Sequence, residues 1–240
     1  MTDTIFENVW SANAEADADP NTLRVSIDTK AVVNIGPYCR RGKSRGLTPV
    51  DAVDHEMDVK TKLVPGGILD VKTGMSFLFF TDNAKTSDFI VDGIVYWWIS
   101  MSSIYTSVKK IVINLDNGPE CNGKRTQFLQ RLVEFVDVFK IIVRLVYYPP
   151  YHSKYNKIEH YWGGLERSWN GYLLESIDEA INRAANFVWK GMHPSVVLFD
   201  TIYKKGVTLS IEERVDLENR LIRSENLPLY DITITPLMVN

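Results

Sequence analysis

Three acidic residues stand at the ends of regular segments, and their placement constrains the fold of this chain more than any other feature. Asp28 lies in the β-branched segment LRVSIDTK, and Asp116 ends the apolar run KIVINLD, 88 positions later. Glu159 follows after another 43 positions, in a helical segment that comes after the aromatic and proline-rich stretch YYPP. Side chains delivered by two strands and a helix can converge, so we expect the three carboxylates to meet at one site.

The order of the expected elements indicates a mixed α/β sheet with helices on both faces. Strands are predicted where apolar and β-branched residues run together, over residues 23–35, 75–81, 110–116 and 140–148. Helices are predicted from apolar periodicity and capping patterns, over residues 3–18, 86–102, 124–137, 154–169, 177–190 and 211–224. Residues 36–67 are expected to form a loop, and residues 227–239 an extended tail.

Serine residues are the expected start signals of the last three helices. Ser153 is a good N-cap for the helix that carries Glu159. Ser176 and Ser210 are each followed three positions later by a glutamate, which is the pattern of a capping box. Gly191 is expected to end the helix that Ser176 begins. The last part of the chain is therefore predicted to be mainly helical.

The length of 240 residues allows one large core with an appendage. We expect residues 1–20 to form a connector helix, residues 21–192 the catalytic core, and residues 193–240 a helical extension packed on that core. The apolar fraction of 45% and the charged fraction of 24% are ordinary for a soluble globular protein.

The two cysteines and the lack of targeting signals indicate a cytoplasmic protein. Cys39 and Cys121 have neither a CxxC partner nor a metal-ligand spacing, which favours a reducing compartment and argues against a structural zinc. The N-terminus has no basic-then-apolar signal pattern, and the longest apolar stretch is too short to cross a bilayer.

Local charge is more informative than the net charge of −3. Residues 38–48 hold four cations and no acid, namely Arg40, Arg41, Lys43 and Arg45. Residues 140–170 hold five Lys or Arg side chains against two acids, one of which is Glu159. Basic segments thus flank the acidic residues, as expected for a protein that holds a polyanion over bound metal ions. Each run by itself is equally typical of a solvated surface.

Three converging carboxylates are typical of sites that bind two divalent cations and act on phosphodiesters. Two such ions, roughly 3.5–4 Å apart, can stabilise both the attacking and the leaving oxygen. Magnesium prefers carboxylate and water oxygens, so few protein ligands suffice. We expect Asp28 to bridge the two ions, Asp116 to hold one and Glu159 the other. Without cations the three acids would repel each other, which predicts raised pKa values.

Each acid alone has a simpler interpretation that stays open. Asp116 precedes Asn-Gly, a common turn sequence, and Asp28 is equally compatible with a hairpin. Glu159 could form a surface ion pair with Lys154 or Lys157. Two further acids, Asp54 and Asp82, are rival candidates for the first ligand. The combination of all three acids on suitable elements favours the metal site.

Several motifs resemble those of the DDE transposases of bacterial insertion sequences, and among these the ISAzo-type subgroup. The resemblance spans about residues 20–235 and is carried by the segments IDTK, TSDFIVD, DNGPE, RTQFLQR, YYPPYHSKYNKIE and WNGYLL. It implies a ribonuclease-H-like catalytic core, two Mg²⁺ or Mn²⁺ ions, and catalytic roles for Asp28, Asp116 and Glu159. It also implies double-stranded DNA as partner, both transposon ends and target, cut by hydrolysis and joined through a 3′ hydroxyl, and a homodimer.

The surroundings of the three motifs supply further candidates. Asn117 is expected to orient Asp116 or a bound water, and His152 and Lys154 to contact a phosphate. The weaker candidates for DNA contact are Arg40, Arg41, Lys43, Arg45, Lys157 and Tyr161. Tyr161 lies off the apolar stripe of its helix and is the preferred candidate for stacking on a base.

The chain departs from the family in one respect. Family members usually carry an N-terminal helix-turn-helix region, which we expect to be absent here because the sequence begins just upstream of Asp28. Sequence-specific recognition of transposon ends is therefore left open. Two alternatives remain: a related nuclease that only hydrolyses DNA, and a remnant that binds DNA or a partner transposase without cutting.

Overall fold

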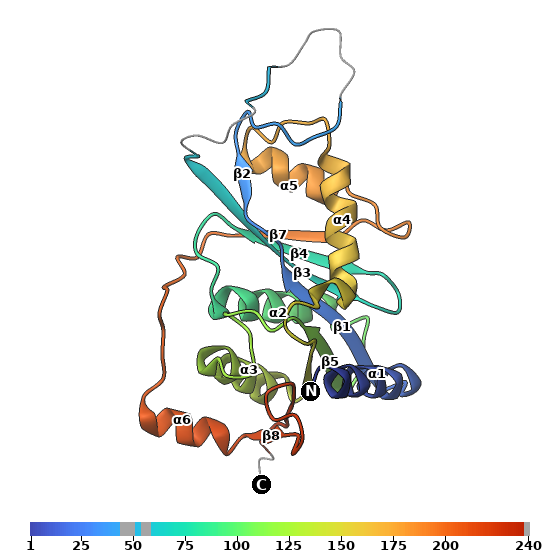
Figure 1. The fold of residues 1–240 in the computed structure, drawn as a ribbon, viewed down its shortest axis with the longest axis vertical. Coiled ribbons are helices and arrows are strands. Elements are labelled where there is room, and N and C mark those ends of the chain that lie inside the picture. The colour runs from blue at the N-terminus through green and yellow to red at the C-terminus, as the bar shows by residue number, and fades with distance from the viewer. Residues whose placement is uncertain (44–50, 54–58, 238–240) are drawn as a thin grey trace.

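The computed structural model describes residues 1–43, 51–53 and 59–237. Its centre is a nine-stranded sheet in the order β7-β4-β3-β1-β5-β6-β9-β8, with β2 paired to β3 beside this path (Figure 1). The strands are β1 (Thr22–Thr29), β2 (Val33–Ile35), β3 (Thr61–Asp70), β4 (Ser76–Thr81), β5 (Lys110–Leu115), β6 (Ile142–Tyr147), β7 (Ser195–Phe199), β8 (Leu221–Arg223) and β9 (Asp231–Ile234).

The sheet is mixed, as predicted. β1 is antiparallel to β3 but parallel to β5, and β5 is parallel to β6. The helices are α1 (Thr2–Ala18), α2 (Ser87–Met101), α3 (Thr126–Phe139), α4 (Lys157–Trp169), α5 (Ile177–Ala185) and α6 (Ile211–Glu218), with a 3₁₀ turn at Ser153–Tyr155.

Helices cover both faces of the sheet, which explains why its central strands are continuously apolar. Along β4, Phe77 and Phe79 pack in the cluster that contains α2 and α3, whereas Leu78 and Phe80 pack in the cluster that contains α4 and α5. The helix predicted over residues 3–18 is α1, whose buried side chains pack against β5 and β6. The prediction of helices on both faces is confirmed.

Strand β3 corrects the prediction that residues 36–67 form a loop. The sequence Pro65-Gly66-Gly67 is typical of a turn, yet these residues lie in a central strand between β1 and β4. The glycines are required by close packing on the two faces. A Cβ atom on Gly66 would collide with the ring of Phe79, and one on Gly67 would lie 2.7 Å from the Trp162 ring.

The C-terminal segment differs from the expected helical extension because part of it belongs to the sheet. β7 pairs with β4, and β9 pairs with β6, so strands from this segment lie on both sides of the centre. Helix α6 begins at the predicted Ser210–Glu213 capping box but ends at Glu218, since β8 follows. Helix α5 ends at Ala185, well before Gly191. No helix in the described residues is long and apolar enough to span a membrane.

Candidate active site

The pairing of β1 with β5 places Asp28 beside Asp116. The parallel register matches Thr22 with Lys110 and Ser26 with Asn114, an offset of 88 residues. The same offset separates the two acids, and β5 ends one residue before Asp116. Because the strands are parallel, both carboxylates leave the sheet at the same edge. The first two predicted ligands are therefore brought together by the hydrogen-bond ladder of the sheet.

Glu159 reaches this edge because the start of α4 is fastened to β1. The Ser26 hydroxyl is hydrogen-bonded to the Asn156 amide oxygen and accepts the backbone N–H of Ile158 at 2.9 Å. The Asn156 amide nitrogen in turn donates to the carbonyl of Ile27 at 3.1 Å. Ser26 and Asn156 are fully buried. These bonds fix the first turn of α4, which carries Glu159, over the end of the strand.

This arrangement corrects the predicted start of the helix. Ser153 begins a short 3₁₀ turn, and α4 starts only at Lys157. Asn156 occupies the N-cap position but makes no side-chain capping bond, because its amide is engaged with β1. A residue type that normally caps a helix is here used to attach the helix to the sheet.

The three acids line one cavity of about 480 Å³. Its wall also contains Trp162 and Glu166 from α4, and Lys30 from the end of β1. Within the described ranges, no three histidine, cysteine or acidic side chains are close enough together to hold a single metal ion. The carboxylates thus surround a space instead of gathering at one point.

Asp28 has the most strongly perturbed carboxyl group of the cavity. Burial raises its pKa to about 7, and the charges of Asp116 and Glu159 act in the same direction. A hydrogen bond of 3.0 Å from the indole Nε1 of Trp162 to Asp28 Oδ2 opposes this increase. The charges of both other acids thus act on Asp28 in the direction that the expected repulsion predicts.

Asp116 is perturbed more weakly. Burial raises the pKa of its carboxyl, while the positive charge of Lys85 and a backbone hydrogen bond from Gly118 lower it. Cys121 is buried nearby, with its Sγ 3.8 Å from Asp116 Oδ1, and burial raises the pKa of the thiol. The loop after β5 therefore places a buried thiol and the acid Glu120 near Asp116, while the cation Lys85 comes from the turn before α2.

The predicted supporting residues lie outside the walls of this cavity. Asn117 lines a separate hollow beside Tyr230. His152 packs edge-on against Phe6, and its Nδ1 is 2.8 Å from the carbonyl of Pro150. Lys154 is exposed, with its ammonium group over the ring of Tyr155. Their predicted roles stay predictions.

The cations proposed for DNA contact are placed differently from one another. The guanidinium of Arg40 lies 3.3 Å from Glu166, which also pairs with Lys30 at 2.6 Å. Arg41 and Lys43 are exposed. Lys157 is exposed at the start of α4. Arg45 lies outside the described residues, as does the rival acid Asp54, and the other rival, Asp82, does not line the cavity.

The preference for Tyr161 as a base-stacking residue is wrong. Its side chain is fully buried, and its hydroxyl is 3.1 Å from the hydroxyl of Ser76. Its ring packs edge-on against Phe187 and Trp189. The apolar face of α4 is wider than one stripe because α5 and the segment after it cover an additional side of the helix.

Sequence reasoning missed four residues that shape the site: Ser26, Asn156, Trp162 and Glu166. Ser26 gave a usable signal, because a hydroxyl in the middle of a buried strand needs a partner. Asn156 gave another, since it directly precedes the first turn of the helix that carries Glu159. Trp162 gave no signal, because its hydrogen bond to Asp28 depends on how α4 lies on the sheet.

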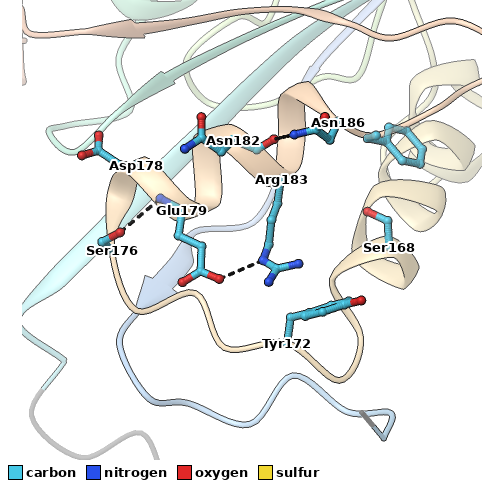
Figure 2. Close-up of a pocket in the computed structure, with 9 residues that line it drawn as sticks. Ser168, Tyr172, Ser176, Asp178, Glu179, Asn182, Arg183 and Asn186 are labelled. Carbon is cyan, nitrogen blue, oxygen red and sulfur yellow. Dashed lines mark hydrogen bonds and ion pairs between the residues drawn. The ribbon is translucent and has the colours of Figure 1, made fainter. Parts of the chain in front are cut away.

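A second hollow, of about 600 Å³, lies beside α5 and contains none of the three acids (Figure 2). The guanidinium of Arg183 lies 3.8 Å from the centre of the Tyr172 ring and pairs with Glu179 at 3.0 Å (Figure 2). Ser176 caps α5 at the edge of the same hollow. These contacts hold α5 against the segment that follows α4. The polar side chains of this hollow therefore have a role in packing the two helices.

Comparison with known proteins identifies the fold and the family. The chain resembles the mariner Mos1 paired end complex with Mg with a TM-score of 0.50 and 10% identity, over 79% of this chain and 56% of that chain. It resembles the Mos1 transposase paired-end complex with left transposon end with a TM-score of 0.49 and 8% identity, over 73% and 49%. The HTLV-2 integrase catalytic core domain in complex with magnesium gives a TM-score of 0.39 and 19% identity, over 72% and 92%.

The first of these likenesses concerns the fold alone, and the fold is ribonuclease-H-like, as the motifs implied. The chain spans about half the length of the Mos1 transposase chains that it matches. No curated protein sequence matches it significantly. The family profile described as "Rhodopirellula transposase DDE domain" matches residues 1–236, so the chain belongs to this family of transposase DDE domains.

Proposed function

We propose that this chain is the catalytic domain of a DDE transposase, which cuts the ends of a mobile DNA element and joins the exposed 3′ hydroxyl to target DNA. The observation that carries the proposal is the meeting of Asp28, Asp116 and Glu159 on one cavity, from β1, the end of β5 and α4. Family membership over residues 1–236 supports the same reaction class.

The residues of the cavity fit divalent metal ions. Three carboxylates supply hard oxygen ligands, and burial together with the charges of Asp116 and Glu159 raises the pKa of Asp28. Asp28 would share two Mg²⁺ or Mn²⁺ ions with Asp116 on one side and Glu159 on the other. When bound, such ions neutralise phosphoryl charge and activate the attacking oxygen.

The other groups of the site act by holding these acids in place. The Trp162 N–H fixes the orientation of the Asp28 carboxylate, and Ser26 with Asn156 fixes the start of α4. Such outer partners typically contribute 10- to 100-fold in metal affinity or activity. Asn117, His152, Lys154, Arg41, Lys43 and Lys157 are proposed to contact bound DNA or water from the surrounding surface.

The decisive experiment is a strand-transfer assay with pre-cut DNA ends in Mg²⁺ or Mn²⁺, comparing the wild type with Asp116→Asn. Metal-dependent joining that disappears in the variant is the expected result. Cleavage without joining would indicate a hydrolytic nuclease, and DNA binding without either product would indicate a non-cutting remnant. Activity that survives Asp116→Asn would refute the assignment of this acid.

We also propose the wider setting. Residues 21–192 form the catalytic part, residues 1–20 act as a connector and residues 193–240 as a packed extension. The protein acts in the bacterial cytoplasm on nucleoid DNA, with a second copy of the chain bringing two ends together. Sedimentation of the chain with and without end DNA tests this pairing, because a 1:1 complex at all concentrations would contradict it.

A further inference from the structure

A separate cleft, of about 580 Å³, lies on the Asp116 side of the acid cavity and is rich in positively charged side chains. Its positive side chains are Lys62, Lys85, Arg125 and Lys205, and the carboxylate among its lining residues is Glu120. They come from β3, the turns before α2 and α3, and the connection between β7 and α6. In Figure 1 that connection runs down the side of the molecule past α2 and α3.

The four positively charged side chains differ in the ion pairs and hydrogen bonds that they make within the protein. Lys85 pairs with Glu120 at 3.5 Å. Arg125 donates from Nε to the Ser87 hydroxyl at 3.2 Å, which keeps its guanidinium at the cleft. Lys62 and Lys205 are exposed and make no ion pair with any residue that the structure describes. Positive charges on a concave surface attract a polyanion.

The cleft is connected to the acids by two neighbours. Lys85 lines the cleft and pairs with Glu120, which lies four residues after Asp116. Pro119 and Glu120, in the loop that begins at Asp116, form part of the cleft wall. A strand that lies across the acid cavity therefore reaches these cations on leaving it.

We propose that the cleft formed by Lys62, Lys85, Arg125 and Lys205 binds the sugar–phosphate backbone of the DNA beside the position where it is cut. Lysine and arginine contacts to phosphates position DNA without reading its sequence. The inference rests on the proposed function and extends it by assigning a DNA path that leaves the site on the Asp116 side, away from Arg41 and Lys43.

Lys62 and Lys205 provide a clean test because replacing them removes no hydrogen bond or ion pair of the described structure. We would measure binding of the full chain to a 30-base-pair duplex in EDTA, by fluorescence anisotropy from 50 to 200 mM KCl. Each phosphate contact contributes a slope of about 0.9 to the fall of log affinity with log salt. Lys62→Gln/Lys205→Gln should therefore lower the slope by about 1.8, so that over this range the wild type loses about twelve-fold more affinity than the variant.

The matched control is Lys72→Gln/Lys190→Gln. Both lysines are exposed. Lys72 lies in the β3–β4 turn, and Lys190, in the segment after α5, lies next to Gly74 of that turn, at the end of the strands opposite the acids. The control should keep the wild-type slope. An unchanged slope in Lys62→Gln/Lys205→Gln, an equal decrease in the control, or no DNA binding by the wild type would each overturn the proposal. Because the assay contains no metal and no cutting, loss of catalysis in the strand-transfer assay leaves its result intact.

Discussion

The indole Nε1 of Trp162 donates a hydrogen bond of 3.0 Å to Oδ2 of Asp28, and so links the helix that carries one acid to the strand that carries another. Trp162 lies three residues after Glu159 on α4, one turn along the helix. The bond ties the position of α4 to the orientation of Asp28. The positions of Glu159 and Asp28 are therefore coupled through the Trp162 side chain.

Replacing Trp162 by Phe tests this coupling. The variant keeps an aromatic ring against the sheet but loses the donor, so the pKa of Asp28 should rise further and the carboxylate should bind cations less readily. We expect the Mg²⁺ concentration for half-maximal cleavage to rise about tenfold. Trp169→Phe is the control, because its buried Nε1 has no hydrogen-bond partner in the described structure. Equal metal dependence in the two variants would show that the bond has no role in metal binding.

The raised pKa of Asp28 makes the metal-free protein less stable at higher pH. The carboxyl titrates at 3.8 when unfolded and at about 7 when folded, so between these values the folded state holds a proton that the unfolded state lacks. Stability must fall as pH rises through this window, and the loss is complete above pH 7. Asp28→Asn should therefore raise the stability at pH 8 in EDTA by about 4 kcal/mol, and should change it little near pH 4.

Urea unfolding of both proteins at the two pH values measures this difference. Adding Mg²⁺ at pH 8 should stabilise the wild type but not Asp28→Asn. A wild-type protein whose stability is flat from pH 4 to 8 would contradict the assignment of a raised pKa.

Asn156→Ala should separate positioning from folding. Removing this buried amide leaves the Ser26 O–H without its acceptor and the Ile27 carbonyl without its Asn156 donor, which costs about 2 kcal/mol of stability. It should also lower cleavage at least tenfold, since the first turn of α4 is released from β1. The matched control is Asn114→Ala, a fully buried amide on β5 that binds Asn13 and lies away from the cavity wall. The control should lose similar stability and keep its cleavage rate, measured well below the melting temperature.

Gly67→Ala should displace the Trp162 ring and so disturb the orientation of Asp28. Gly67 is the register partner of Asp28 on β3, and an added Cβ would lie 2.7 Å from the Trp162 ring. Overpacking of this kind typically costs 1–3 kcal/mol. The ring must move, so we expect the Mg²⁺ concentration for half-maximal cleavage to rise while the stability of the protein falls. Retention of wild-type metal dependence, checked by the same cleavage titration, would mean that α4 can shift without moving Asp28.

The sequence was sufficient for the features that depend on local pattern. Strand β5, helices α2 and α3 and the convergence of the three acids follow from apolar runs, periodicity and motif spacing. Strand β3 did not follow, because the glycines that read as a turn are required by rings from Phe79 and Trp162, which come from other elements. Tyr161 was misplaced for the same reason, since its burial depends on α5 and the segment after it.

The register of β1 with β5 determines which changes this active site can tolerate. The distance between Asp28 and Asp116 is set by the hydrogen-bond ladder, not by the long chain segment that connects them. Insertions or deletions in the connections between strands therefore leave the pair intact, and natural variation in length should concentrate there. A slip of one residue between β1 and β5 would instead turn Asp28 to the opposite face of the sheet, so the ladder itself has no such freedom.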